Sequence, residues 1–290
     1  MKKVLWFILI LFGTGTIGVF VAGYSLCKPN NHLVPALPGT EFKRIEILSE
    51  NKRVTVAWVA DGINGKGVIL AHGNSSDRNS MVPRMRYFHS MGYAVIAPDL
   101  NGHGETIGNR KTFGFRESKD IESANRYLRL ELGIKWIGAL GTSLGGASIL
   151  KAESDGSEFN AIIIESVFSD IRVAASNRLE MKFGKFGKYM EPILTAQIPL
   201  WLGFSRDKLR PKIWAQKCHV PILILTGDAD ERARPWESAE IFAQVPTQSK
   251  KIHIFKGAKH QDLFAFNQSE YDQEINQFIK NIESDSTSIK

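Results

Sequence analysis

The sequence predicts an α/β fold with a mostly parallel central sheet flanked by helices, carrying a helical insertion. Three observations support this prediction. Short apolar runs typical of buried strands alternate with segments of helical spacing. The stretch 167–210 interrupts that alternation and holds no convincing strand. An uncharged run at the N-terminus precedes all of these elements and stands apart from them.

Each predicted element follows from its local pattern. Compact runs rich in Val, Ile and Leu, bounded by polar or Gly-containing turns, predict strands. They lie at 42–48, 53–60, 68–71, 93–97, 136–140, 161–164, 221–225 and 252–255, with a turn at 49–52. Apolar residues three and four apart predict helices between the strands. These lie at 81–91, 115–132, directly after residue 143, at 236–243 and at 268–282.

Composition restricts the class of protein. The chain has 290 residues, of which 43% are hydrophobic and 23% charged, which is typical of a folded domain. The formal net charge of +7 comes without a dense Lys/Arg tract, so nothing indicates nucleic-acid binding. Two cysteines, Cys27 and Cys218, exclude a disulfide framework and show no metal-ligand spacing, although a single bridge between them is conceivable.

The N-terminal segment predicts a membrane helix. Lys2 and Lys3 precede an uncharged run, 4–27, that Lys28 ends. About 20 apolar residues suffice to cross a bilayer, whereas the apolar part of a signal peptide is usually shorter. We therefore expect a single-pass anchor with the catalytic domain extracytoplasmic, or periplasmic in a bacterium. A signal segment cleaved near residues 21–23 and a buried core helix are the alternatives.

Composition also sets the expected domain limits. Residues 1–27 form the transmembrane anchor or signal segment, and 28–40, rich in Pro and Asn, a linker. The main domain covers 41–283, and 284–290 form a flexible tail. Within the domain, 167–210 mixes basic and aromatic residues, and we expect it to form a helical lid at the sheet edge where ligands bind. Such a lid would form a substrate pocket with its apolar inner face and touch a membrane with its basic outer face. A solvated helical pair that merely packs on the domain is the alternative.

The stretch WIGALGTSLGGASIL, 136–150, contains the pattern Gly141-Thr142-Ser143-Leu144-Gly145. A strand precedes this pattern and a helix follows it, which is the setting of a nucleophile elbow. The sharp turn would present the Ser143 hydroxyl above the sheet, with the helix N-terminus behind it. A plain Gly-rich turn is the alternative. Ser143 is the predicted nucleophile.

A serine nucleophile needs a base to take its proton. His260 lies in a loop after the last predicted strand. In chains with a nucleophile elbow, the catalytic residues follow the order serine, acid, histidine, so the base comes last. His72 and His103 also occupy Gly-flanked loops and are the rivals. His260 is the predicted base.

An acid must orient the histidine. Asp230 lies three residues beyond Gly227, in the loop after strand 221–225, and is the predicted acid. The alternatives in the same loop and after the preceding strand are Asp228, Glu231, Glu165 and Asp170.

The oxyanion of the reaction needs N–H donors. The amide of Leu144 is one expected donor. The amide of Asn74 is the other, because Gly73 would let the backbone approach closely. We expect His72 to brace this loop by hydrogen bonds.

With these parts in order, the chain resembles the α/β-hydrolase superfamily. The matching landmarks, over roughly 42–282, are HGNSSD from His72, APDLNGHGET from Ala97, GTSLGG from Gly141, ILILTGDADERARP from Ile222 and FKGAKHQDL from Phe255. Within it, the HGN opening and ESVFSDIR from Glu165 are most similar to the serine-aminopeptidase (S33) or hydrolase-4 group and to membrane-associated ABHD13/ABHD17-type hydrolases. Asn101 stands where the superfamily's D-x-R-G-x-G loop has arginine, which puts in doubt the contacts that arginine would make.

The resemblance implies an α/β-hydrolase fold and the mechanism of a serine hydrolase, and it does not identify the substrate. Together with the N-terminal run, it leads to the hypothesis of a membrane-anchored serine hydrolase that acts on a carboxylic ester or thioester. The expected substrate is a small molecule or lipid with an acyl chain, and no metal or organic cofactor is required. An acyltransferase using the same residues and a catalytically silent binding protein are the alternatives. The oligomeric state is not predicted.

Overall fold

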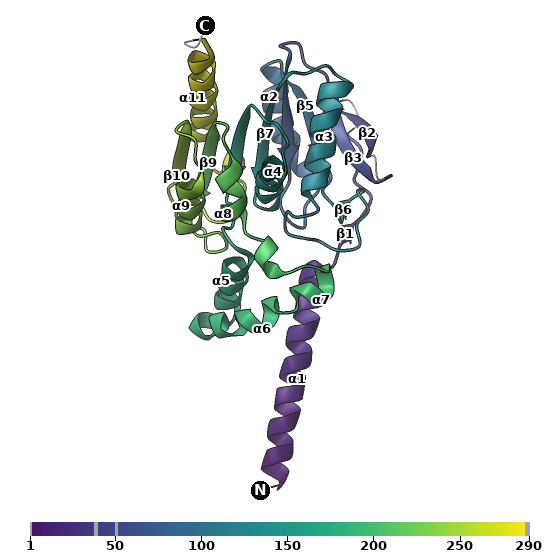
Figure 1. Ribbon diagram of the computed structural model, residues 1–290, viewed down its shortest axis with the longest axis vertical. Helices are drawn as coiled ribbons and strands as arrows, with labels where there is room; N and C mark the ends of the chain where they lie inside the picture. Colours follow the sequence, from purple (N-terminus) through teal and green to yellow (C-terminus); the bar gives the residue numbers. More distant parts are fainter. Residues whose placement is uncertain (1, 38–39, 50–51, 288–290) are drawn as a thin grey trace.

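The computed structural model describes residues 2–37, 40–49 and 52–287. Its centre is an eight-stranded sheet of order β10-β9-β8-β7-β4-β5-β3-β2 (Figure 1). The strands are β2 (Lys43–Leu48), β3 (Val54–Ala60), β4 (Lys66–Ala71), β5 (Ala94–Pro98), β7 (Trp136–Thr142), β8 (Ala161–Glu165), β9 (Ile222–Gly227) and β10 (Lys250–Phe255). The predicted strands lie within a few residues of these. The predicted turn at 49–52, the linker and the tail fall partly outside the described residues.

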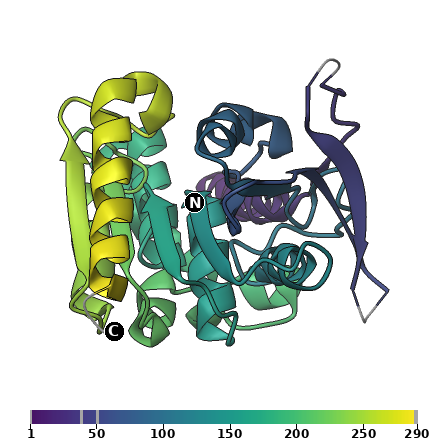
Figure 2. The same cartoon turned by 90° about the horizontal axis from the view of Figure 1, so that it is seen from above.

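Strands β4, β5, β7, β8, β9 and β10 of this sheet are parallel to one another. The sheet has two antiparallel pairings, β3 with β5 and β2 with β3. In Figure 2 the sheet runs from β10 on the left to β2 and β3 on the right. The parallel strands are almost entirely buried, because helices cover both faces of this part of the sheet. The predicted parallel α/β fold is therefore confirmed.

Two apolar cores lie on the two faces of the sheet. One core packs α3 (Ser118–Leu130), α4 (Leu144–Ser154), α8 (Pro211–Trp214) and α9 (Pro235–Gln244) against it, through residues such as Ile121, Ala147 and Trp214. The other packs α2 (Val82–Ser90) and α11 (Gln268–Thr287) against the opposite face, through residues such as Met85, Phe88 and Ile275. This layering holds the ends of the central strands, and the loops that follow them, in fixed positions.

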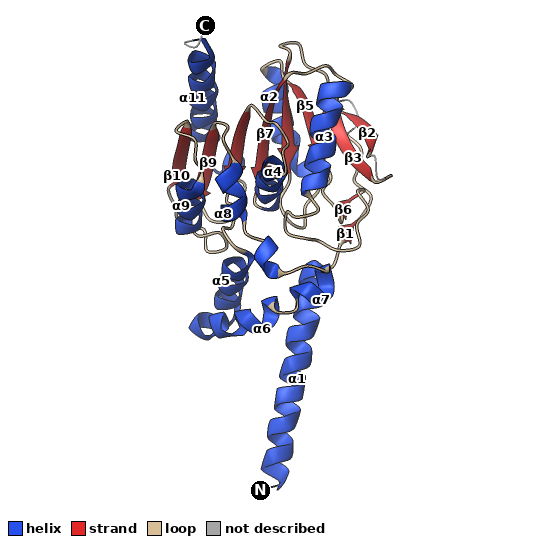
Figure 3. Cartoon of the chain, in the orientation of Figure 1, coloured by secondary structure: helices blue, strands red, loops and turns tan. Residues whose placement is uncertain are grey.

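The segment predicted as a helical insertion is helical. It contains α5 (Ile171–Phe183), α6 (Glu191–Thr195) and α7 (Ile198–Leu202), with 3-10 turns at Gly184–Met190 and Arg206–Lys208. Figure 3 shows these helices gathered between the sheet and the long N-terminal helix. A short helix, α10 (Leu263–Phe266), precedes α11 and contributes Leu263 and Phe264 to the same core as α2 and α11.

The N-terminal helix, α1, spans Lys2–Cys27 and projects from the body beside α6 and α7 (Figure 1). It coincides with the segment predicted to be a membrane anchor. In the part of the chain that the structure describes, no helix is both long enough and apolar enough to span a membrane. The conceivable bridge between Cys27 and Cys218 is not formed, because both are free, buried thiols.

The chain after α1 packs against the body. Asn30–Asn31 form β1, which pairs in parallel with β6 (His103–Gly104). The backbone amide of Lys111 donates to the carbonyl of Cys27 at 2.8 Å, and Val34 is buried. The first half of the predicted linker thus has its own strand pairing with the body.

Candidate active site

Ser143 lies at a sharp turn between β7 and α4. Its backbone adopts φ 51° and ψ −107°, a conformation that costs free energy for a non-glycine residue. Two glycines make room for the turn. A Cβ on Gly145 would lie 2.2 Å from the carbonyl oxygen of Ala71, and one on Gly141 would lie 2.4 Å from the backbone of Gly145. Ser143 therefore stands at the N-terminus of a helix, where the helix dipole is positive.

His260 and Asp230 lie together. His260 Nδ1 is 2.8 Å from Asp230 Oδ2. The other carboxylate oxygen of Asp230 accepts hydrogen bonds from the amides of Arg232 and Ala233 at 2.8 and 2.9 Å. Burial opposes ionisation of Asp230, but the hydrogen bond and charge of His260 and these two amides keep its pKa below the ordinary value. Asp230 is thus held as a carboxylate that fixes the orientation of His260.

The other acids of this loop are placed differently. Asp228 Oδ1 accepts a hydrogen bond from the amide of Gly257 at 2.6 Å, so this carboxylate holds two loops together. Glu231 is exposed. Only Asp230 among these three makes a hydrogen bond to His260 within the described part of the chain.

The two acids after β8 have partners of their own. Glu165 is fully buried and receives hydrogen bonds from Arg84, at 3.0 and 2.7 Å, and from the Tyr271 hydroxyl. Asp170 caps α5 by accepting from the amide of Arg172 at 2.9 Å. These contacts leave Asp230 as the acid that the structure places against the histidine.

The loop after β4 is braced by His72. Its Nε2 accepts a hydrogen bond from the amide of Leu100 at 3.0 Å, so its Nδ1 carries the proton and donates to the carbonyl of Gly73 at 2.8 Å. Burial lowers the pKa of His72, which keeps this ring neutral. The brace that we expected of His72 is present. Among the described residues, the amides of Asn74 and Leu144 donate to no acceptor.

His103, the other rival base, supports the same loop. Its Nε2 lies 3.3 Å from Asn74 Oδ1 and its Nδ1 lies 3.1 Å from the carbonyl oxygen of Asn101. Burial lowers the pKa of His103 to about 3, so the ring is neutral. A Cβ on Gly73 would lie 3.7 Å from the Thr142 carbonyl oxygen, an ordinary contact, so packing alone does not require glycine there.

Ser143 lies where two cavities meet. A polar cavity of about 350 Å³ is lined by Ser143, His260, Asn74 and the serines of the loop after β4. A mostly apolar cavity of about 80 Å³ is lined by Ser143, Leu144 and Asn74, by residues of α5, α6 and α7, and by the end of α1. Arg178 of α5 lies at the junction, since it lines both cavities. His260 lines the polar cavity and does not line the apolar one.

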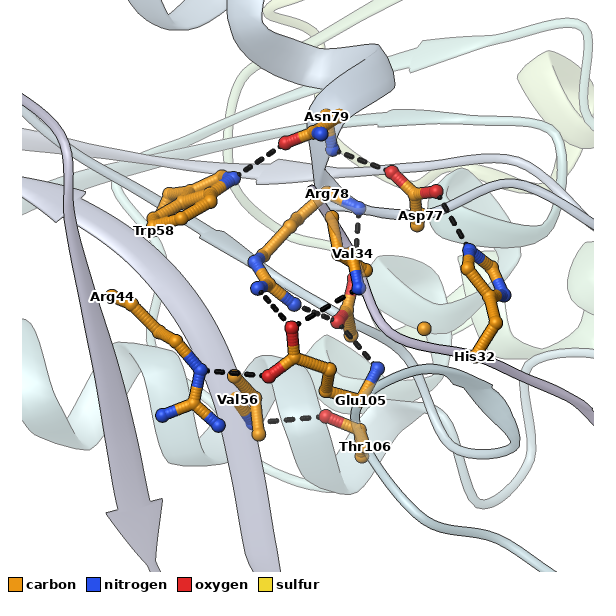
Figure 4. Close-up of polar contacts among 12 residues, drawn as sticks. His32, Val34, Arg44, Val56, Trp58, Asp77, Arg78, Asn79, Glu105 and Thr106 are labelled. Atoms are coloured by element: carbon orange, nitrogen blue, oxygen red, sulfur yellow. Dashed lines mark hydrogen bonds and ion pairs between the residues drawn. The ribbon is translucent and has the colours of Figure 1, made fainter. Parts of the chain in front are cut away.

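Buried arginines supply contacts that the sequence did not indicate. Asn101 leaves Asp99 without the arginine of the resembled loop, and Arg78 replaces it from the turn after β4. The Arg78 side chain is fully buried, binds Asp99 and Glu105, and lies 4.5 Å from the centre of the Trp58 ring (Figure 4). Its position one residue after the HGNSSD motif was the available signal.

Glu105 joins this arginine cluster to the sheet edge. Arg44 Nε is 2.7 Å from Glu105, and the amide of Val34 donates to it at 3.1 Å (Figure 4). Burial opposes ionisation, but the hydrogen bonds from Arg78 and Arg44 lower the pKa of Glu105 to about 2. The cluster braces the loop that carries His103. Within the described residues, no group of His, Cys, Asp and Glu side chains is arranged to hold a metal ion.

Comparisons with known proteins give the same fold. The profile of the prolyl oligopeptidase family matches residues 79–284. Protein bem46 of Schizosaccharomyces pombe is 25% identical over 253 residues, covering 84% of this chain and 79% of the relative. The uncharacterized protein YqkD of Bacillus subtilis is 23% identical over 225 residues, covering 76% and 72%. The structure of the Pyrococcus furiosus esterase Pf2001 superposes with a TM-score of 0.73 at 22% identity, covering 89% of this chain and 98% of the esterase.

Proposed function

The chain belongs to the prolyl oligopeptidase family and is a serine hydrolase with an α/β-hydrolase fold; we propose that it cleaves a carboxylic ester or thioester with an acyl chain. The observation that carries this proposal is the position of Ser143. It stands at a strained elbow, on one cavity with the His260–Asp230 pair and beside an apolar cavity suited to an acyl chain.

In the proposed reaction, His260 takes the proton of the Ser143 hydroxyl through Nε2, because Asp230 occupies Nδ1. The serine oxygen attacks the acyl carbon, and the amides of Asn74 and Leu144 donate to the oxyanion. Each such donor typically contributes about 3 kcal/mol of transition-state stabilisation. His260 then gives its proton to the departing alcohol or thiol. Water deprotonated by His260 attacks the acyl-enzyme, releases the acid and restores the Ser143 hydroxyl.

Labelling with a fluorophosphonate probe tests the nucleophile. The wild-type protein should be labelled, and Ser143→Ala should not. Ser154→Ala, at the far end of α4, is the matched control and should label as the wild type does. Equal labelling of wild type and Ser143→Ala would contradict the proposal.

Transfer of the acyl group to an alcohol is the second candidate, because the apolar cavity beside Ser143 can exclude water. Product analysis in mixed water and alcohol separates the two reactions. A catalytically silent binding protein would show neither product nor labelling. The narrower grouping with the S33, ABHD13 and ABHD17 hydrolases also stays a prediction.

Membrane anchoring is a separate part of the proposal and rests on the sequence. The uncharged run 4–27 after Lys2 and Lys3 supports a single-pass anchor with the catalytic domain extracytoplasmic. Washing membranes with alkaline carbonate should leave the protein in the pellet, and protease added to spheroplasts or intact cells should reach the catalytic domain. Recovery in the wash would contradict the anchor, and full protection from protease would contradict the orientation.

A further inference from the structure

A groove lined by cations opens from the polar cavity. The cavity that holds Ser143 and His260 is also lined by Arg178 of α5 and by Arg232 of the loop after β9. These two arginines, with Met181 and Lys182, line a second hollow of about 370 Å³ at the surface. The two hollows share Arg178 and Arg232 and thus form one path from the nucleophile to solvent, called here the cationic groove.

The cations of this groove lack the partners that neighbouring arginines have. No ion pair joins Arg178, Lys182 or Arg232 to a carboxylate among the residues described, whereas Arg172 on the same helix pairs with Asp170 and Asp207. Arg178 Nη1 donates only to the carbonyl of Ala174, at 2.9 Å. Burial and the charge of nearby Arg232 lower the pKa of Arg178, and the charges of Glu237 and Asp230 offset this only in part.

The acids near the groove are already engaged. Asp262, which lines the polar cavity itself, pairs with Arg84 at 2.7 Å. Asp230 holds His260, and Glu237 accepts hydrogen bonds from Asn177, at 2.7 Å, and from the amides of Ser169 and Arg234 at 3.0 Å each. The groove therefore keeps guanidinium donors that no carboxylate of the described chain binds directly, although Glu237 and Asp230 lie near enough to act on Arg178 through their charge. One more group there lacks a partner. The Ser166 hydroxyl is 2% exposed, lines the polar cavity and makes no hydrogen bond in the described structure.

The position of His260 shows which part of a substrate would meet these groups. In the proposed reaction His260 protonates the leaving alcohol or thiol, so the leaving group must lie beside it. His260 lines the polar cavity and not the apolar one. The leaving group therefore occupies the polar cavity, and the acyl chain occupies the apolar cavity among α5, α6, α7 and the end of α1.

We propose that the substrate is an acyl ester or thioester whose leaving group carries a compact anion, a phosphate or a carboxylate, bound between Arg178 and Arg232 with the Ser166 hydroxyl beside it. This inference rests on the proposed function. Guanidinium groups suit such anions because they present paired N–H donors to two oxygens at once. The two cavities then divide the substrate at its scissile bond, apolar on the acyl side and anionic on the other.

Three esters with one decanoyl chain test this substrate class: those of glycerol, of glycerol phosphate and of lactate. The readout is the concentration of each ester that halves the rate at which a fluorophosphonate labels Ser143. For the wild type, an anionic ester should protect at a concentration lower by about tenfold or more than the glycerol ester, since a hydrogen bond to a charged group contributes about 1.5 kcal/mol or more. Preference for the phosphate or the carboxylate ester identifies which anion the groove takes.

Substitutions then locate the preference. The preference is expressed as the half-protecting concentration of the glycerol ester divided by that of the anionic ester. Arg178→Gln and Arg232→Gln should each reduce this ratio by about tenfold. Arg178→Lys should keep much of the preference for the anionic ester, because the positive charge remains. This variant separates anion binding from a purely structural role of Arg178. Arg172→Gln, on the same helix but outside both cavities, is the matched control and should keep the wild-type ratio.

Several results would overturn the inference. Equal or better protection by the glycerol ester would do so, and so would a ratio unchanged in both glutamine variants. Glycerol phosphate without the acyl chain should protect far more weakly than its ester, and equal protection would exclude the divided substrate. If Ser143 is not labelled at all, the proposed function itself fails, an outcome distinct from labelling without preference for anions.

Discussion

At the scale of single residues, the chemistry of this site was predictable where it depends on chain-local geometry. The turn at Ser143 requires residues without side chains on both sides, and Gly141 and Gly145 make this turn predictable from the sequence. Arg178 and Arg232 carry no comparable signal. They are far apart in the chain, and what distinguishes them is that they line one cavity and form no ion pair with a carboxylate of the described residues. Pairing of that kind depends on the packed structure, so the sequence alone did not reveal it.

Substitution of the acid separates its role from that of its neighbour. Asp230→Asn should reduce kcat by roughly 10³- to 10⁴-fold, because an amide opposite Nδ1 favours the wrong histidine tautomer. Asp228→Asn is the matched control, since Asp228 contacts the Gly257 amide and not His260. Steady-state hydrolysis of a p-nitrophenyl ester measures both. A larger loss in Asp228→Asn than in Asp230→Asn would reverse the assignment of the acid.

His103 gives the molecule a pH-dependent share of its stability. Its pKa lies at about 3 in the folded protein, below the ordinary value of 6.5. Below pH 6.5 the His103 ring therefore binds a proton in the unfolded chain but stays neutral in the folded one. The contribution of His103 to the free energy of unfolding is lost as pH falls from 6.5 towards 3. Between about pH 7.5 and about pH 5.5, the wild type should lose about 1 kcal/mol more unfolding free energy than His103→Gln.

Denaturant titrations at the two pH values measure this difference. His219→Gln removes an exposed histidine and is the control, expected to show the pH dependence of the wild type. An equal loss in the wild type and in His103→Gln would mean that the folded protein tolerates a charged ring at position 103.

At the scale of elements, the long and periodic segments were predictable and the shortest were not. All the strands of the main sheet were expected within a few residues, because each is a compact apolar run. The helical insertion was predicted because the segment 167–210 contains no pattern typical of a strand. The pair β1 and β6 was missed, since two residues each carry no pattern. The division of 167–210 into α5, α6 and α7 was not predicted, because these helices pack on one another and on α1, which lies far away in the sequence.

The contact between α1 and α7 forms part of the apolar cavity. Trp201 of α7 lines that cavity, and its ring lies edge-on to Phe20 and Tyr24 of α1, with ring centres 4.7 and 5.3 Å apart. Gly23 allows this approach, since a Cβ there would lie 3.2 Å from Trp201 Nε1. The N-terminal helix is therefore a wall of the expected acyl site.

Removal of this ring should change the preference for acyl-chain length. Trp201→Ala should lower the ratio of kcat/KM for decanoyl over acetyl p-nitrophenyl esters by about tenfold, because a long chain loses apolar contact that a short one never makes. Leu200→Ala, at a neighbouring side chain that is 64% exposed, is the control. A ratio unchanged in Trp201→Ala would place the acyl chain elsewhere.

At the scale of the whole molecule, one buried ionic cluster joins distant parts of the chain. Arg84 of α2 pairs with Glu165 at the end of β8 and with Asp262 in the loop of His260, each at 2.7 Å. Tyr271 of α11 adds its hydroxyl to the same cluster. Arg84 and Glu165 are buried, so each depends on the other to offset the loss of water around its charge.

Loss of this arginine should destabilise the fold as a whole. Arg84→Met leaves Glu165 buried without its cation, which typically costs about 3 to 5 kcal/mol. Arg86→Met, an exposed arginine on the same helix, should change the unfolding free energy by less than about 0.5 kcal/mol. Urea titrations followed by fluorescence compare the two. Similar midpoints for both variants would show that the cluster contributes little net stability.

The pairing of β1 with β6 has a mechanical result for the molecule. The backbone amide of Asn30 donates to the carbonyl of Gly102 at 2.6 Å, and that of His32 to the carbonyl of Gly104 at 2.9 Å, directly after α1 ends. Because this pairing begins directly after α1, the connecting segment leaves α1 little freedom to rotate relative to the body. The direction of α1 relative to the sheet is therefore set by the body itself, and the two cavities beside Ser143 share that frame of reference.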